Sequence, residues 1–330
     1  MLKGQPQVRV AVPGPSHLVT AKYTTKLQAI ARKAYQMAAK TVIAAVRAQA
    51  VAVDHADHSD HADAKKVNPA QVRLPMPIER ASNQLDDDVD AYTLTLPTTT
   101  IAGTAATATE ASVAGTTLRI AKTLGLRAVD PGTELAAARD NWIAENSALI
   151  KSIPREVADR VQTKVQTMLK AGSRWETIAS HLEQEEGIAT RRAATIARDQ
   201  VSKYNGALNQ AHQQAAGIEH YEWRGAMDAR ERPEHVALQG LVFAWDSPPP
   251  IGHPGEPIMC RCVAVPITSA AKIAQPQPEV TEEWLVKRTT ELGPKARDVG
   301  KSQEKLAELA RKSVAEQIRM AANRQAILRK

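Results

Sequence analysis

Two cysteines and two histidines in the last third of the chain are the residues best suited to chemistry: His235, His253, Cys260 and Cys262. In a strand, residues i and i+2 point to the same face, so Cys260 and Cys262 would direct both sulfurs one way. Two thiolates and two imidazoles form the Cys2His2 set that zinc takes in structural sites. Such sites usually separate paired cysteines by about two to four residues, and here one residue intervenes. Two interpretations stay open: one structural zinc, or two half-buried thiols with two surface histidines.

The stretch from Asp228 to Cys262 is also where an enzyme would be sought. Cys260 near His235 or His253 could supply a nucleophile and its base. The sequence has no nucleophile elbow, no Walker loop, no His-Glu-x-x-His and no dinucleotide fingerprint. We therefore expect no enzymatic activity and no cofactor other than the one zinc, and an enzyme in this lobe is the less favoured alternative.

Short strands and a stiff loop must position these side chains. The sequence predicts strands over residues 221–224, 240–245 and 260–267 and a short helix over residues 233–239. Five prolines between residues 246 and 257 exclude a helix there and require an irregular, stiff loop. We expect a small lobe that combines sheet and helix.

The chain before this lobe predicts long helices, because it is rich in alanine and other good helix formers. Pro154 fits the first turn of a helix, and Gly187 fits a helix end. We expect helices over residues 20–53, 134–151, 154–169, 173–187 and 190–217. A helix-turn-helix for DNA could lie around Gly187, but the neighbouring glutamates would repel phosphates, so an ordinary helical hairpin is favoured.

Two segments of the N-terminal part are harder to assign. The run Thr93–Ile101 alternates and contains Pro97, which predicts an edge strand or an extended arm. Residues 54–63 read DHADHSDHAD, with histidines three residues apart that could chelate a metal on a helix. A solvated linker is the favoured interpretation of that run.

These elements predict a mainly α protein with a helical domain of long helices, a small α+β C-terminal lobe, and extended N-terminal and C-terminal arms. Residues 1–130 would hold a basic arm, a long helix and an extended region rich in threonine and alanine. Residues 131–217 would form the helical domain, residues 218–270 the lobe, and residues 271–330 a linker and a basic helical tail.

The positive charge is concentrated at the start of the chain. The formal net charge is +7, and residues 1–53 contain no aspartate or glutamate. That stretch carries eight cations, so the rest of the chain sums to about −1: Lys3, Arg9, Lys22, Lys26, Arg32, Lys33, Lys40 and Arg47. Such an arm predicts an anionic partner, namely nucleic acid bound without sequence preference, an acidic protein surface or lipid headgroups. The alternative is a solvated helix face that happens to lack acids.

Composition narrows the class of protein further. Two cysteines in 330 residues exclude a scaffold held by disulfides. No apolar run approaches the roughly 18 residues of a membrane span, and the first residues lead into no secretory signal. We therefore expect a soluble protein of a reducing cytoplasm.

Several strings, in order along the chain, resemble the phage Mu F-like head morphogenesis family, the minor head proteins of tailed phages. They are GSRWETIASHL, RRAATIARDQVSKYNGALNQ, MDARERPEH and GHPGEPIMCRC, and the resemblance runs from about Trp142 to Pro266. Some members carry Cys-x-x-Cys where this chain has residues 232–235, Arg-Pro-Glu-His. A four-ligand metal site here would therefore need both His235 and His253.

The resemblance implies a structural role in the phage head. It implies a protein of the virion, assembled in the host bacterial cytoplasm and bound to the portal protein at the unique vertex. Major capsid or scaffold proteins are further expected partners, and procapsid assembly, DNA packaging or DNA ejection the expected process. A protein that binds double-stranded DNA, packaged or ejected, is the main alternative.

Overall fold

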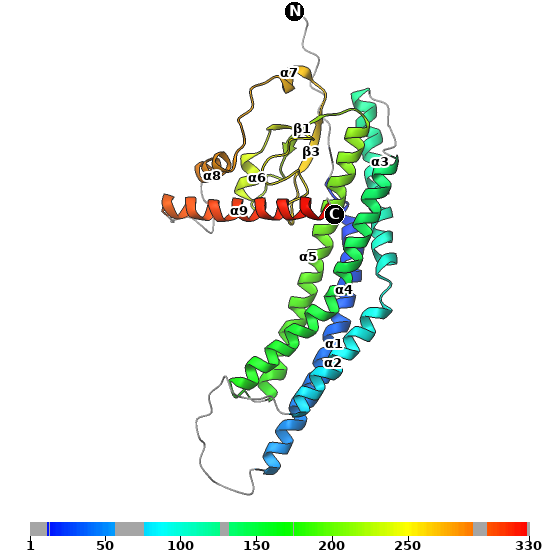
Figure 1. Cartoon of the computed structure of the whole chain (residues 1–330), viewed down its shortest axis with the longest axis vertical. Helices are drawn as coiled ribbons and strands as arrows, with labels where there is room; N and C mark the ends of the chain where they lie inside the picture. Colours follow the sequence, from blue (N-terminus) through cyan, green and yellow to red (C-terminus); the bar gives the residue numbers. More distant parts are fainter. Residues whose placement is uncertain are drawn as a thin grey trace, which may run out of the picture. The chain divides into compact units, whose positions relative to one another are not determined.

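The computed structural model describes residue 12 and residues 14–56, 76–125, 132–173, 175–292 and 302–328. This part of the chain is mainly α-helical with one three-stranded sheet, which confirms the predicted fold class (Figure 1). None of the described helices combines the length and the apolar character needed to cross a lipid bilayer.

Contacts divide the chain into two compact units. The helical unit consists of the described residues of Ala21–Gly103 and Ile143–Ala197. The lobe unit contains the described residues of Thr104–Trp142 and Arg198–Lys330, with those before Ala21. These boundaries differ from the expected division at residues 130 and 217, because single long helices contribute residues to both units.

Five helices make up most of the chain: α1 (His17–Ala56), α2 (Met76–Thr95), α3 (Thr98–Leu124), α4 (Gly132–Lys170) and α5 (Trp175–Ala215). The predicted helix over residues 20–53 is therefore present as α1. Of the histidine-rich run, residues 54–56 end α1, and the remainder lies outside the described residues.

Helix α1 is a core element of the helical unit. Its buried side chains recur every three or four residues, from Tyr23 and Leu27 to Val46, as in an amphipathic helix. The Tyr23 hydroxyl donates to Asn146 Oδ1 of α4 at 3.0 Å, and the Tyr35 hydroxyl donates to the Leu182 carbonyl of α5 at 2.8 Å. The long helix expected over residues 20–53 therefore begins at His17, and its apolar stripe is buried against α4 and α5.

The threonine-rich run around Pro97 is helical, so the predicted strand or extended arm is wrong. Residues up to Thr95 belong to α2, and Thr98 begins α3. Threonine hydroxyls in these helices donate to the carbonyl four residues earlier, as Thr93 does to Val89 at 2.7 Å and Thr109 to Ala105 at 2.7 Å. These bonds satisfy the hydroxyl groups while the backbone stays helical. Pro97 lies between the helices, where its missing N–H interrupts neither.

The helix breaks predicted at Pro154 and Gly187 do not occur. Helix α4 continues through Pro154, and α5 continues through Gly187. Ile153, Val157, Ala189 and Ala193 are buried on either side of these positions, so packing offsets the roughly 1 kcal/mol that an internal glycine costs and the larger cost of proline. Since α5 is one helix, the chain has neither a helical hairpin nor a helix-turn-helix at this position.

The lobe is built on three antiparallel strands in the order β2-β1-β3. Strand β1 (His220–Arg224) is central, and its Tyr221 pairs with Phe243 of β2 (Val242–Ala244) and with Pro266 of β3 (Val263–Ile267). Helix α6 (Pro233–Ala237) lies between β1 and β2 in the chain. All four elements were predicted, although β3 begins after the two cysteines.

Three further helices follow the sheet: α7 (Ala270–Ile273), α8 (Glu282–Glu291) and α9 (Gln303–Leu328). Leu285 of α8 and Val314 of α9 are fully buried in one hydrophobic cluster with Tyr221 and Trp223 of β1. The expected separate linker and tail therefore supply part of the lobe's core.

Candidate metal centre

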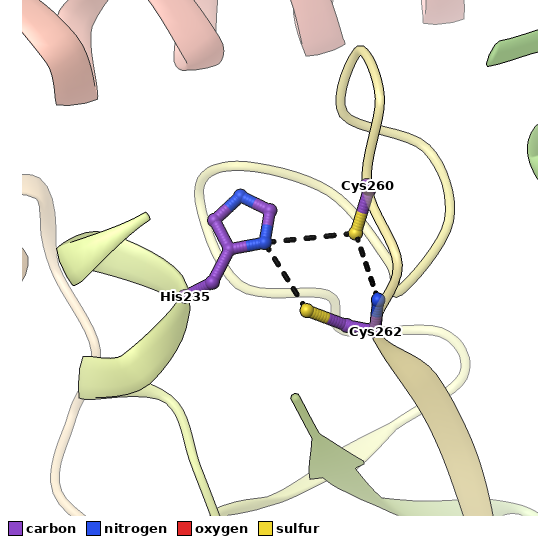
Figure 2. Close-up of side chains that lie close together, drawn as sticks. All are labelled: His235, Cys260 and Cys262. Carbon is purple, nitrogen blue, oxygen red and sulfur yellow. Dashed lines mark hydrogen bonds between the residues drawn. The ribbon is translucent and has the colours of Figure 1, made fainter. Parts of the chain in front are cut away.

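His235, Cys260 and Cys262 form a buried group in the lobe (Figure 2). Helix α6 carries the histidine, and the segment entering β3 carries the cysteines. His235 Nδ1 lies 3.2 Å from Cys262 Sγ and 3.6 Å from Cys260 Sγ, and all three ligand atoms lie within 4.8 Å of one another. One imidazole nitrogen and two sulfurs at this spacing can hold a metal ion.

His253, the fourth predicted ligand, lies outside this group. Its Nδ1 is 2.9 Å from the Tyr221 hydroxyl, and its ring centroid is 5.0 Å from that of Trp245. Its backbone N–H donates to Glu256 Oε2 at 2.7 Å. Burial lowers the pKa of His253, which favours the neutral ring. The structure therefore places His253 in the packing of the proline-rich loop.

Glu231 is a neighbour of the cysteines that the sequence analysis missed. Its Oε1 accepts a hydrogen bond from Cys262 Sγ at 3.2 Å, and its other oxygen accepts one from the backbone N–H of Met227. A Cβ on Gly225 would meet the Glu231 carboxylate at 2.0 Å, so the glycine makes room for it. In the sequence, Glu231 is one of several alternating charges, and nothing distinguishes it from a solvated residue.

Hydrogen bonding gives the two cysteines opposite protonation preferences. Burial favours the neutral thiol of Cys260, but hydrogen bonds from Cys262 and His235 outweigh it, and the pKa of Cys260 falls well below its usual range. The same bond with Cys260, together with burial and the Glu231 carboxylate, raises the pKa of Cys262. Burial lowers the pKa of His235, but its contact with Cys260 reverses this, and the net shift is upward. These shifts favour the charged forms of Cys260 and His235, and a metal ion would displace the remaining protons.

Helix α5 holds the cysteine segment through four residues that we call the α5 clamp: Asp199, Ser202, Gly206 and Gln213. Asp199 Oδ1 accepts from the Met259 N–H at 2.6 Å, and Ser202 Oγ donates to the Cys260 carbonyl at 2.6 Å. Gln213 Nε2 donates to the Ala264 carbonyl of β3 at 2.9 Å. The ARDQVSKYNG string of the sequence therefore has a structural explanation, since its polar residues fix the backbone that presents the ligands.

Two residues beside the centre have strained backbones. Met227 has φ 54° and Met259 has φ 55°, a region that residues with a Cβ seldom adopt. A carboxylate oxygen accepts the N–H of each residue, from Glu231 and Asp199 respectively. Both Nη atoms of Arg261 donate to the Asp228 carboxylate at 2.5 Å. This ion pair joins the chain next to Met227 to the chain that follows Met259. Strain held by its surroundings in this way is typical of functional sites.

Gly206 offers a direct test of the clamp. A Cβ added there would lie 3.0 Å from the Pro254 carbonyl oxygen and 3.5 Å from Gly255 Cα. We expect Gly206→Val to lower the free energy of unfolding of the lobe unit by about 1–3 kcal/mol, because a branched side chain would force the loop off the helix. Urea unfolding followed by tryptophan fluorescence measures this change.

Gly115 is the matched control, because it also lies within a helix and a Cβ there meets nothing within 4 Å. Gly115→Ala should stabilise its helix by up to about 1 kcal/mol. Unchanged stability of the Gly206→Val variant would show that the loop does not rest on α5.

The predicted cations of the N-terminal arm are placed mainly on α1. Lys22, Lys26, Lys33 and Lys40 are exposed and lie four, seven and seven residues apart, and they form no ion pair with other described residues. We call these four the lysine stripe. Arg47, also exposed, continues the same seven-residue spacing. Arg32 lies off the stripe and pairs with Glu186 Oε1 at 3.1 Å, and Lys3 and Arg9 lie outside the described residues.

The described part of the chain is thus a mainly helical protein with a small lobe that contains a buried His-Cys-Cys group. Residues 159–265 match the family described as Phage Mu protein F like protein, which confirms the resemblance seen in the sequence. The matched residues include the α5 clamp and all three residues of the candidate metal centre. Helices α1, α2, α3, α7, α8 and α9 lie outside the match.

One similar protein comes from Haemophilus influenzae (strain ATCC 51907 / DSM 11121 / KW20 / Rd) and is described as an uncharacterized protein. It is 38% identical over 125 residues, which are 38% of this chain. The chain thus spans 28% of the length of that relative. No solved structure matches the chain.

Proposed function

We propose that the chain is a head morphogenesis protein of a tailed phage that acts by binding other head proteins. The observation that carries this proposal is the family match over residues 159–265, which contains the clamp and the metal centre. We place the protein in the virion head at the portal vertex, with the portal protein as main partner and major capsid or scaffold proteins as further partners. In this role it would support procapsid assembly, DNA packaging or DNA ejection.

A structural role also agrees with the accessibility of the cysteines. Cys260 and Cys262 are both buried, and the backbone around Cys260 is held by Ser202. A nucleophilic cysteine must be reached by its substrate, whereas a structural thiolate needs no access. An enzyme in the lobe is therefore not our proposal.

We further propose that His235, Cys260 and Cys262 bind one structural zinc ion. Zinc bonds sulfur at about 2.3 Å and nitrogen at about 2.0–2.1 Å, which places tetrahedral ligand atoms about 3.5–3.8 Å apart. The nitrogen–sulfur distances of 3.2 and 3.6 Å are close to that spacing, so the residues present fit the ion. Bound zinc would join α6 to the β3 segment, and Glu231 beside Cys262 is the nearest candidate to complete the ligand set.

Localisation in assembled heads tests the proposed role. Heads from cells that produce the chain with a small tag should show the tag at the one vertex that carries the portal, by electron microscopy. The purified chain should also bind isolated portal rings. A tag distributed over all capsid vertices, or heads that assemble and fill with DNA equally well without the chain, would contradict the proposal.

Contact with DNA is a second candidate function, favoured by the lysine stripe. Lys22 and Lys40 are 18 positions apart, so the stripe extends over about 27 Å at the rise of an α-helix. A spacing of seven residues keeps the cations on nearly one side of the helix. Within the described residues these lysines form no ion pair, and a row of such cations suits the phosphates of a DNA backbone, contacts that position a protein on DNA without reading its bases.

Salt dependence measures how many phosphates the stripe contacts. Each phosphate contact contributes about 0.9 to the slope of log affinity against log salt, so replacing all four stripe lysines by glutamine should reduce that slope by about 3–4 units. A control variant changes Lys122, Lys151, Lys170 and Lys287 to glutamine, which alters net charge equally at exposed positions off the stripe. Equal loss of slope in both variants would assign DNA binding to overall charge.

A further inference from the structure

Gln317 of α9 contacts the candidate metal centre from outside the matched family region. Its side-chain Oε1 lies 2.9 Å from His235 Nε2, on the side of the ring opposite the two cysteines. Gln317 is 4% exposed, so water does not compete for this contact. An amide oxygen can only accept, so His235 Nε2 carries the proton when it bonds Gln317, and Nδ1 faces the sulfurs. Arg232 Nε lies 3.3 Å from the same Nε2, and it could donate there only to a ring without that proton. The 2.9 Å contact with Gln317 is the shorter of the two.

The amide of Gln317 is itself held in one orientation. Its Nε2 donates to Glu234 Oε1, and the Ser313 hydroxyl donates to the same oxygen at 2.8 Å. Glu234 is 1% exposed, so its carboxylate depends on these donors and on Arg232, whose Nε lies 3.8 Å away. A flipped Gln317 amide would place its NH2 group against the His235 N–H and its oxygen against the carboxylate. The orientation is therefore fixed by charge and hydrogen bonding together.

From this arrangement we propose that Gln317 is a positioning residue for the metal ligand His235, and that metal binding and the docking of α9 on the lobe stabilise each other. The inference rests on the proposed zinc. Partners on the second ring nitrogen of a ligating histidine fix the tautomer and typically change metal affinity by about 10- to 100-fold. Coupling between two binding events is reciprocal, so an α9 that strengthens the site must be held more firmly when the site is filled.

The packing of α9 gives the coupling a physical route. Val314 and Ile318, on either side of Gln317, contact the hydrophobic cluster that also contains Cys260 and Cys262. Helix α9 therefore packs against the same hydrophobic core that a bound metal would stabilise. Fluctuations that lift α9 would remove the Gln317 acceptor from His235 at the same time as they expose that core.

Zinc affinity and hydrogen exchange test the proposal on the full chain. We expect Gln317→Leu to weaken zinc binding by about 10-fold or more, measured by competition with a chelator of known affinity. Glu316→Gln, at an exposed position one residue away on α9, should bind zinc as tightly as the parent. In the parent, zinc should slow hydrogen exchange of the α9 amides from Val314 to Ile318.

A double variant in which residues 234 and 317 exchange side chains distinguishes a hydrogen-bonding role of Gln317 from a role in packing alone. In the double variant Glu234→Gln with Gln317→Glu, residue 317 still offers His235 an acceptor and residue 234 supplies the amide donor. Its zinc affinity should return towards that of the parent. If Gln317→Leu does not fold, the zinc affinity of the double variant and the hydrogen exchange of the parent test the proposal.

The outcomes distinguish this inference from the zinc proposal. A parent chain that binds no zinc overturns both. A parent that binds zinc while α9 exchange stays unchanged, or a folded Gln317→Leu variant with parental affinity, overturns the coupling and leaves the zinc site intact.

Discussion

Replacing Cys260 by serine should release the metal and lower the free energy of unfolding of the lobe by at least about 3 kcal/mol. Apparent binding free energies for structural zinc are about 10–16 kcal/mol in small domains, and this binding is coupled to folding. The core of the lobe lies beside a proline-rich loop, so a zinc ion joining α6 to the segment before β3 would contribute a large share of the lobe's stability. The serine hydroxyl replaces a sulfur that contacts His235 and accepts the backbone N–H groups of Gly255 and Cys262.

Metal content and unfolding of the same samples check this expectation. The parent should contain about one zinc per chain, and a chelator should shift its unfolding to lower urea concentration. His253→Gln is the informative control, because His253 is also buried in the lobe but lies outside the three-residue group. It should retain zinc even where it weakens the packing against Tyr221 and Trp245. A parent whose stability is indifferent to chelation would exclude the staple.

Local signals were sufficient to predict the lobe from the sequence. Alternation identified β1, five prolines identified the loop, and the short helix predicted over residues 233–239 is present as α6. The Cys260–Cys262 pair and His235 were singled out by type and spacing. Those signals could not show whether His253 joins the cysteines as a metal ligand. The path of the proline-rich loop decides this, and it places His253 against Tyr221.

Long-range partners of the centre could not be read from spacing. Gln317 is 82 residues from His235, and its helix resembled a polar tail in the sequence. Only the buried Val314 and the partly buried Ile318 beside it show which face of α9 meets the lobe. Ser202 and Asp199 stood in a conspicuous string, yet their role as backbone partners of Cys260 and Met259 depends on the fold.

The helical part shows the opposite error, in which local signals were given too much weight. Pro154, Gly187 and the threonines around Pro97 all favour breaks or extended chain when taken alone. Their costs are about 1 kcal/mol for a glycine and a few kcal/mol for a proline. Burial of the flanking Ile153, Val157, Ala189 and Ala193 outweighs these costs, and that burial requires partner helices which no local pattern specifies.

The same reasoning makes α1 indispensable to the helical unit. Leu27 is 0% exposed, and it lies between Tyr23 and Tyr35, whose hydroxyls bond to α4 and α5. We expect Leu27→Ala to lower the free energy of unfolding by about 2–5 kcal/mol, because it removes buried methyl groups and leaves a cavity. A chain without residues 1–53 would lose the whole apolar stripe of α1, so we expect its helical unit not to fold.

Leu18→Ala is the matched control, since it makes the same change on the same helix at a side chain that is 64% exposed. Its effect should stay within about 0.5 kcal/mol of the parent, as surface substitutions usually do. Urea unfolding followed by far-ultraviolet circular dichroism compares the two variants.

If Leu27→Ala were as mild as Leu18→Ala, α1 would be a detachable basic arm. The lysine stripe could then be studied on an isolated peptide. If Leu27→Ala is much more destabilising than Leu18→Ala, α1 is part of the folded helical unit. The lysine stripe would then meet its partner as one face of that unit, because only the folded helix keeps the lysines aligned on one side.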